Sequence, residues 1–283
     1  MNPSSGAMAT KSPDIIEITA HEEGMRSYLR RIWQYRALAR VLAARSIRIT
    51  YSQTALGLAW AVIQPTVAIV IYSVFFYSIL GIDTGATPYP VFVFPGVIAW
   101  FHFAQIFSDA GSSLQKSQEL IRKVEFPRII LPISQVLSGL VFVGISFLLM
   151  IVLLLIFRVE LTWRIAFFPF FLVLNLIAGS TIAIWLSALS FRYRDLQHIV
   201  PYLLNYLIWV TPVFYPTTIL GPKYEYLLYL NPMAGIVSGY RWSLVGTGFP
   251  EWQFFLPLIP LILLFVGGVF YFKRVDRVIE DYI

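Results

Sequence analysis

Charged side chains are absent from six long stretches of this chain. No Asp, Glu, Lys or Arg occurs in residues 49–82, 84–108, 129–157, 165–191, 196–222 or 252–272. About 20 helical residues cross the roughly 30 Å hydrocarbon core of a bilayer, so each stretch is long enough to span a membrane. A charge at bilayer depth costs about 2.5–3.5 kcal/mol on insertion scales, which explains why charges are missing there. The sequence therefore predicts an all-α membrane protein with six transmembrane helices.

The composition leaves little room for a large soluble domain. Only 13% of the 283 residues are charged, against about 25% in soluble proteins. The absence of cysteine excludes disulfides, thiol ligands and thiol nucleophiles. The net charge of +6 is explained more simply by basic loops at a membrane than by nucleic-acid binding. We expect no cleavable signal peptide, because residues 1–24 carry four acids and no apolar run.

The basic residues predict which way the protein faces. Six spans place both termini on one side, and that side holds 17 of the 21 Lys and Arg residues. By the positive-inside rule this is the cytoplasmic side. The uncharged segment 226–240 tests this topology, but about 15 residues are too few for a seventh span, and Asn231-Pro232 interrupts it. We interpret the segment as an external re-entrant or interfacial hairpin.

The amino-terminal part of the chain divides in two. Residues 1–24 are expected to be a disordered tail. Residues 25–55 carry apolar side chains at helical spacing with seven arginines interleaved, which predicts an amphipathic helix in the cytoplasmic headgroup plane. This helix serves either as an anchor and orientation signal or also as a cuff that meets an anionic lipid-linked substrate. The transmembrane domain then covers 56–274, and 275–283 form a cytoplasmic tail.

The most charged internal loop, 114–127, follows the second span. We expect a short helix that ends before Pro127, because the residue preceding a proline avoids the helical region. Apolar side chains among its charges are expected to face the cytoplasm and dock into a groove of a partner protein. The alternative is that they dip into the bilayer interface. These side chains are Leu120, Ile121, Val124 and Phe126.

The fifth span is unusual, because Pro201, Pro212 and Pro216 break it. It also carries a polar-aromatic stripe at i, i+3, i+4 and i+7. Aromatic faces with hydrogen-bonding tips suit sugars, so the stripe is a candidate to line a transport pathway. Simple helix–helix contact is the alternative. The members of this stripe are Tyr202, Asn205, Tyr206 and Trp209.

The fourth span carries a stripe of small residues at four-residue spacing, formed by Gly179, Ala183 and Ser187. Small residues let helices approach closely, and ordinary packing within the chain is the expected use of this stripe.

Several kinds of chemistry are missing from the sequence. It has no phosphate-binding loop, so the chain itself is not expected to bind or hydrolyse ATP. No metal site is expected, because the three histidines have no neighbouring ligand cluster. His102 is the only acid or base inside the spans, whereas ion-coupled carriers keep such groups at the midplane. We therefore expect no catalytic residues and no cofactor in this chain, and an external energy source.

Five motifs, in this order along the chain, resemble the permease subunits of type-2 ABC exporters that move polysaccharides such as O-antigen, capsule and teichoic acid. They are Leu120–Arg128, Arg192–Asp195, Thr211–Pro216, Leu230–Gly235 and Tyr240–Leu244. The resemblance covers about residues 28–276 and implies a bacterial inner-membrane protein. It also implies a homodimer with two separate subunits that bind ATP and Mg²⁺.

The resemblance implies roles for two of the segments. The hairpin at Asn231 and Pro232 would act as an external gate that helps close the exit. The 114–127 loop would act as a coupling helix that contacts the ATPase. Its coupling residues would be Leu120, Ile121, Arg122, Lys123, Glu125, Phe126 and Pro127.

The expected substrate is an anionic glycan linked to a lipid pyrophosphate, which enters from the cytoplasmic leaflet. Basic segments at a membrane gain about 1 kcal/mol per charge, so the arginines that flank the spans are candidates to attract the pyrophosphate. They are Arg40, Arg45, Arg48, Arg192 and Arg194. For the last two, stop-transfer orientation is the alternative role.

Three other functions remain open. The nearest is an exporter of a lipid or small molecule with the same fold. A membrane-embedded enzyme acting on lipid-linked sugars would need paired acids or a nucleophile–base pair, and neither is evident. A secondary carrier is disfavoured by the nearly empty span interiors.

Overall fold

The computed structural model describes residues 24–52, 57–193 and 195–282, and it contains helices but no strand among them. Apart from Gly24, the predicted disordered tail lies outside the described residues. The basic amino-terminal segment forms two helices that meet at Tyr35, α1 (Met25–Gln34) and α2 (Arg36–Ser52). The remaining principal helices are α3 (Trp60–Tyr72), α4 (Tyr89–Gln105), α7 (Ile130–Ile156), α8 (Phe168–Arg192), α9 (Leu196–Val210), α10 (Gly221–Leu228), α11 (Pro232–Val245) and α12 (Leu258–Tyr282).

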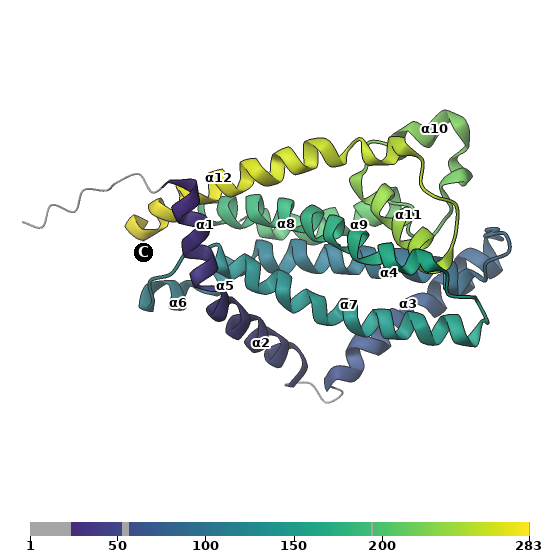
Figure 1. The fold of residues 1–283 in the computed structure, drawn as a ribbon, viewed down its shortest axis with the longest axis horizontal. Coiled ribbons are helices and arrows are strands. Elements are labelled where there is room, and N and C mark those ends of the chain that lie inside the picture. The colour runs from purple at the N-terminus through teal and green to yellow at the C-terminus, as the bar shows by residue number, and fades with distance from the viewer. Residues whose placement is uncertain (1–23, 53–56, 194, 283) are drawn as a thin grey trace, which may run out of the picture.

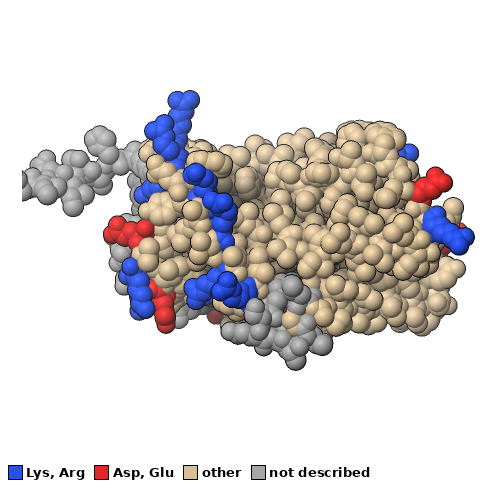
Figure 2. Space-filling view, turned by 60° about the horizontal axis from the view of Figure 1, so that its bottom comes forward, with Lys and Arg blue, Asp and Glu red and all other residues tan. Residues whose placement is uncertain are grey.

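Among the described residues, five helical segments are long and apolar enough to cross a membrane: Trp60–Ile79, Tyr89–Ala110, Ile130–Ile156, Trp163–Ser190 and Trp252–Asp276. They form an elongated bundle (Figure 1). On the face shown in Figure 2, charged side chains gather at the two ends of the molecule and leave an uncharged band between them. We call the end that holds α1, α2 and the last turns of α12 the basic end. This distribution is the one that a bilayer demands.

The fifth predicted span is not one continuous helix. Its helical part, α9, has 15 residues and ends where Thr211 turns to an extended conformation. Pro212 and Pro216 follow, and neither has a backbone N–H with which to continue a helix. The predicted break is thus confirmed at these two prolines, whereas Pro201 lies inside α9. The chain then forms the hairpin of α10 and α11 at the end of the bundle opposite the basic end (Figure 1).

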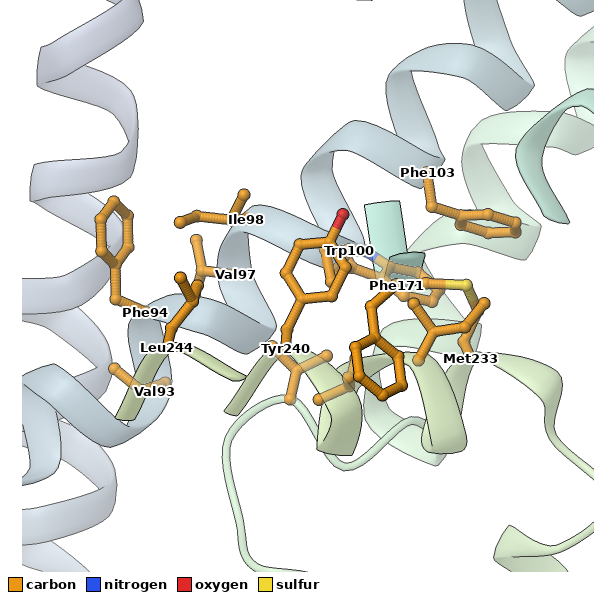
Figure 3. Packing of buried hydrophobic residues seen from close by; sticks show 14 of the residues in the cluster. Val93, Phe94, Val97, Ile98, Trp100, Phe103, Phe171, Met233, Tyr240 and Leu244 are labelled. Atoms are coloured by element: carbon orange, nitrogen blue, oxygen red, sulfur yellow. The ribbon is translucent and has the colours of Figure 1, made fainter. Parts of the chain in front are cut away.

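Helix α4 is the centre of the bundle, and 78% of its membrane-length window is buried. It packs against α3, α7, α8 and α11. Figure 3 shows Val97 and Trp100 of α4 close to Tyr240 of α11 and Phe171 of α8. Because α4 is enclosed by protein rather than lipid, its side chains position the neighbouring segments.

Two π-helical turns extend the first two spans: η2 (Ser73–Ile79) follows α3, and η3 (Ile106–Ala110) follows α4. The small-residue stripe of α8 packs closely against η3, since a Cβ at Gly179 would lie only 2.9 Å from the Ile106 side chain. Further along the stripe, the Ser187 hydroxyl lies 3.5 Å from that of Ser113. The predicted packing of this stripe within the chain is therefore confirmed.

A close backbone approach fixes α11 against the loop that precedes α12. A Cβ at Gly235 would lie 2.5 Å from the backbone oxygen of Phe254, whereas a Cβ at Gly144 of α7 would meet nothing within 4 Å. We predict that Gly235→Ala lowers the thermal unfolding midpoint of the detergent-solubilised protein, because overpacking costs about 1–3 kcal/mol. Gly144→Ala is the control and should leave the midpoint unchanged or raise it, since alanine favours helix. Equal midpoints for the two variants would contradict this packing.

Candidate functional site

The polar-aromatic stripe lies on the surface of α9. Tyr202, Tyr206 and Trp209 are 66%, 70% and 56% exposed, and Asn205 is exposed beside them. An amide that faces hydrocarbon has no hydrogen-bond partner and costs free energy. The stripe therefore fits a water-filled path or a second protein surface better than it fits lipid.

The last member of the stripe connects α9 to α3. The ring of Trp209 lies 6.3 Å from that of Phe76 in η2 and 5.5 Å from that of Phe214. Phe76 and Phe214 stack on each other at 5.1 Å. These rings hold the carboxyl end of α9 against the end of the first span.

The non-helical segment Thr211–Tyr215 is buried over most of its length. Backbone groups in an apolar bundle need hydrogen-bond partners, and here side chains from other helices supply them. The Arg241 guanidinium donates to the carbonyl of Val213 through Nη2 at 2.6 Å and to that of Tyr215 through Nη1 at 3.4 Å. The carbonyl between them, on Phe214, accepts from the Tyr89 hydroxyl at 2.7 Å.

Arg241 is itself deeply buried, with 3% of its surface exposed. Its Nε donates to the carbonyl of Phe92 at 3.2 Å, and the guanidinium lies 4.0 Å from the centroid of the Phe92 ring. Gly96 makes room for this arrangement, because a Cβ there would lie 3.0 Å from the carbonyl oxygen of Val213 and 3.3 Å from Nη2 of Arg241. Arg241 belongs to the Tyr240–Leu244 motif, but the sequence predicted no role for its side chain. Its position among uncharged neighbours was the signal that it had a specific role.

The predicted gate residues lie at the start of α11. Asn231 caps the helix by accepting the N–H of Met233 at 2.9 Å, and Pro232 takes the first helical position. The Asn231 amide also donates to the Thr211 hydroxyl at 3.0 Å. Both ends of the non-helical segment are therefore tied to α11, one through Asn231 and the other through Arg241.

At the basic end, α5 (Ser113–Lys116) and α6 (Gln118–Lys123) form the predicted coupling loop, and α6 ends before Pro127 as expected. We call residues 113–127, which include the predicted loop 114–127, the coupling segment, after the role predicted for that loop. The expectation that its apolar residues all face outward is wrong for Ile121 and Phe126, which are 6% and 3% exposed. They pack in a cluster with Tyr28 of α1 and Phe272 of α12.

Leu120 of the coupling segment is only partly exposed, and Pro127 is buried. The outward-facing tip consists of Arg122, Lys123, Val124 and Glu125. The tip is fixed to α1 by the Tyr35 hydroxyl, which donates to the carbonyl of Glu125 at 3.3 Å. The apolar residues of the segment therefore mostly attach it to its own chain.

A buried carboxylate joins three segments at the basic end. Asp276 of α12 is 3% exposed and accepts a hydrogen bond from the Tyr28 hydroxyl of α1 at 3.2 Å. It also accepts the backbone N–H of Arg128 at 3.2 Å, and its Oδ1 lies 3.8 Å from Nε of the same residue. Arg128 directly follows the coupling segment, so Asp276 links α1, that segment and α12.

The predicted pyrophosphate residues do not form one cluster. Arg40, Arg45 and Arg48 are all exposed along α2, and Arg45 lines a cavity of about 700 Å³ between α2, the coupling segment and α7. Arg194 and the side chain of Arg192 lie outside the described residues. A second cavity of about 520 Å³ lies between α3, α4 and α7 and is lined by Trp60, Gln64, Phe101 and Gln105, among others.

No group of three or more His, Asp or Glu side chains that could hold a metal ion occurs in the part of the chain that the structure describes. His102 is fully buried in α4, and its imidazole faces Gly139 of α7, where a Cβ would lie 3.4 Å from it. It therefore lies inside the bundle rather than near its surface.

Comparison with known proteins identifies the chain's relatives. The family model described as ABC-2 type transporter matches residues 37–245. The chain is 27% identical over 257 residues to the O-antigen export system permease protein RfbA of Myxococcus xanthus, which covers 89% of this chain and 98% of the relative. It is 25% identical to a Klebsiella pneumoniae protein of the same name, over 80% of this chain and 88% of the relative. It is 22% identical to the polysialic acid transport protein KpsM of Escherichia coli, over 85% of this chain and 94% of the relative.

The Arg241 contacts generate a stability prediction. Arg241→Lys keeps the charge, but an ammonium cannot reproduce the planar fork that serves Phe92, Val213 and Tyr215 together. A hydrogen bond to a charged group is worth about 1.5–3 kcal/mol, and the substitution breaks more than one of them. We therefore expect a large fall in the midpoint of thermal unfolding followed by tryptophan fluorescence. Arg158→Lys, at an exposed arginine, should leave the midpoint unchanged. If the two variants unfold at the same temperature, the hydrogen bonds of Arg241 do not stabilise the segment Thr211–Tyr215.

The Asp276 junction generates a second prediction. Asp276→Asn weakens the link between α12 and Arg128 and should let the coupling segment open more often. We expect faster trypsin cleavage after Arg122 and Lys123, by about tenfold for every 1.4 kcal/mol of local stability lost. Asp195→Asn removes an exposed carboxylate elsewhere in the chain and serves as the control. Unchanged cleavage in Asp276→Asn would show that the junction does not restrain the segment.

Proposed function

Since the chain belongs to the ABC-2 type transporter family, we propose that it is the permease subunit of an ATP-driven exporter of a lipid-linked polysaccharide such as O-antigen. The observation that carries this proposal is the match to an O-antigen export permease over 98% of that protein's length. The match to a polysialic acid transport protein supports a glycan substrate independently. The chain's own role is transport rather than catalysis.

The proposed topology has six crossings in the bacterial inner membrane, with both termini in the cytoplasm. The five long helices supply five crossings, and α9 with the buried segment Thr211–Tyr215 supplies the sixth. Tyr28 of α1 bonds Asp276 of α12, which agrees with both ends of the chain lying on one side. The excess of Lys and Arg supports a cytoplasmic location for that side.

A second copy of the chain is proposed to complete the path. The exposed stripe Tyr202, Asn205, Tyr206 and Trp209 places hydroxyl, amide and indole groups on one face of α9. Two such faces in a homodimer would enclose a channel whose aromatic rings stack on sugars and whose polar tips bond the hydroxyls. This arrangement also removes Asn205 from contact with lipid.

The hairpin of α10 and α11 is proposed as the external gate. Asn231 and Arg241 hold the non-helical segment from its two ends. Since α9 leads directly into that segment, a shift of α9 would change these contacts. The gate residues Asn231 and Pro232 thus adjoin the end of the proposed path.

Energy is proposed to come from two separate ATP-binding subunits, which bind ATP and Mg²⁺, because the sequence has no phosphate-binding loop. Their docking surface would be the exposed tip Arg122, Lys123, Val124 and Glu125. Leu120, Ile121 and Phe126 would transmit the force, since they pack in the cluster that anchors the tip to the bundle, together with the buried Pro127. The basic residues Arg40, Arg45, Arg48, Arg192 and Arg194 are proposed to attract the lipid pyrophosphate.

The tip provides the test of this function. Val124→Asp places a charge at the centre of the docking surface and should lower cell-surface glycan at least tenfold without lowering the amount of permease in the membrane. Val124→Thr keeps the shape of the side chain and should retain export. Deleting the ATP-binding subunit should abolish export altogether. Glycan export that survives this deletion would overturn the proposed function.

A further inference from the structure

We propose that the cavity between α2, the coupling segment and α7 binds the sugar-diphosphate head group of the exported lipid. This proposal rests on the proposed function and specifies where the exported lipid first binds the permease. The cavity measures about 700 Å³, within the range of small-molecule sites. Its walls include Arg45 of α2, Lys116 at the end of α5 and Lys123 at the end of α6. It lies at the basic end, where a lipid head group in the cytoplasmic leaflet would meet the protein.

The cations of the cavity can receive a diphosphate. Within the described residues, neither Arg45 nor Lys123 takes part in an ion pair, and both side chains are exposed. Lys116 is partly engaged, because its Nζ lies 3.5 Å from Oδ1 of Asp109. A diphosphate would therefore find two uncommitted cations and a third that it shares with Asp109, in charge-assisted hydrogen bonds. Of the three predicted arginines on α2, Arg45 lines this cavity, whereas Arg40 and Arg48 do not.

The acids of the cavity favour a head group that carries sugar. Asp109 and Glu119 line the same space, and their carboxylates can accept hydrogen bonds from a ligand. A carboxylate accepts hydrogen bonds but cannot donate them, so sugar hydroxyls are suitable partners. Ser117, Gln118 and Ser134 add hydroxyl and amide groups to the lining. This mixture of charges fits a glycosylated diphosphate better than a bare phosphate.

The remaining lining residues suit the lipid chain of the ligand, and one of them is shared with the second cavity. Leu42, Ile49 and Leu131 add apolar groups to the lining, against which the part of the lipid chain next to the diphosphate can pack. Thr50 lines both this cavity and the second one, where Trp60 and Phe101 stand beside two glutamines. Thr50 is therefore a wall residue of both cavities.

The position of the cavity has a consequence for energy coupling. Residues 116–120 and Lys123 of the coupling segment line the cavity, and the same segment presents the tip proposed to contact the ATPase. A head group held by Lys116 and Lys123 would restrain that segment directly. Substrate occupancy and ATPase contact would therefore depend on the same few residues.

The test measures binding to the full-length permease alone, in nanodiscs of phosphatidylethanolamine, by native mass spectrometry. The probe is N-acetylglucosamine linked through diphosphate to farnesol, and farnesyl diphosphate, phosphatidylglycerol and inorganic pyrophosphate form the comparison arms. We expect Arg45→Gln combined with Lys123→Gln to raise the Kd of the probe at least tenfold. The control, Arg30→Gln combined with Arg274→Gln, removes the same charge from exposed positions near the same end and should change the Kd less than twofold. Glu119→Gln should reduce the preference for the probe over farnesyl diphosphate.

Three results would overturn the proposal. Equal losses in the two double variants would show general surface electrostatics instead of a site. Pyrophosphate or phosphatidylglycerol binding as tightly as the probe would show that neither the sugar nor the prenyl chain is recognised. No saturable binding to the wild-type permease, in a strain whose permease still exports glycan, would remove the head-group site while leaving the proposed function intact. The opposite pattern, a protein that binds the probe but exports no glycan, would contradict the proposed function and support the site.

Discussion

The rest of this structure depends on one constraint, which is that backbone carbonyls released from a helix inside an apolar bundle need hydrogen-bond donors. The segment Thr211–Tyr215 leaves helical geometry at buried depth, where each unpaired carbonyl costs several kcal/mol. Arg241 and Tyr89 supply donors for the carbonyls of Val213, Phe214 and Tyr215. Those donors are fixed by α11 and α4, so the break in the fifth span determines how the hairpin must pack. The buried position of α11 follows from this requirement.

At the basic end, a buried carboxylate joins separate segments by hydrogen bonds, as the Arg241 guanidinium does at the other end. Asp276 is buried, and its oxygens accept hydrogen bonds from Tyr28 and from the backbone of Arg128. A buried charge is tolerated when it is paired and hydrogen-bonded, and removing one partner is costly. The junction therefore requires α1, the coupling segment and α12 to be present together. Two buried charges, Arg241 and Asp276, thus specify the packing at opposite ends of the bundle.

The sequence predicted the features that depend on composition, namely the long helices and the break after α9. It did not predict which side chains of a segment point into the bundle. The charge-free stretches correctly predicted the long helices, because the hydrocarbon core excludes charged side chains from every helix that crosses it. The prolines at 212 and 216 correctly marked the break after α9, since proline cannot continue a helix. The pattern could not show that Ile121 and Phe126 point inward, because their covering helices, α1 and α12, lie far away in the sequence. Arg241 was missed for the same reason, since its partners Phe92 and Val213 lie 149 and 28 residues away.

Helix α4 and its extension η3 connect the two ends of the bundle. Near its start, Phe92 and Gly96 accommodate Arg241. At its far end, Asp109 reaches the cavity beside the coupling segment and pairs with Lys116. An α-helix is stiff along its axis, whereas a π-helical turn such as Ile106–Ala110 is a rare local departure often found at functional sites. A displacement of the coupling segment must therefore either move α4, and with it the seat of Arg241, or be absorbed within η3. The close fit of Ile106 against Gly179 restrains movement within η3, so we expect the hydrogen bonds of Arg241 to respond to displacements at the basic end.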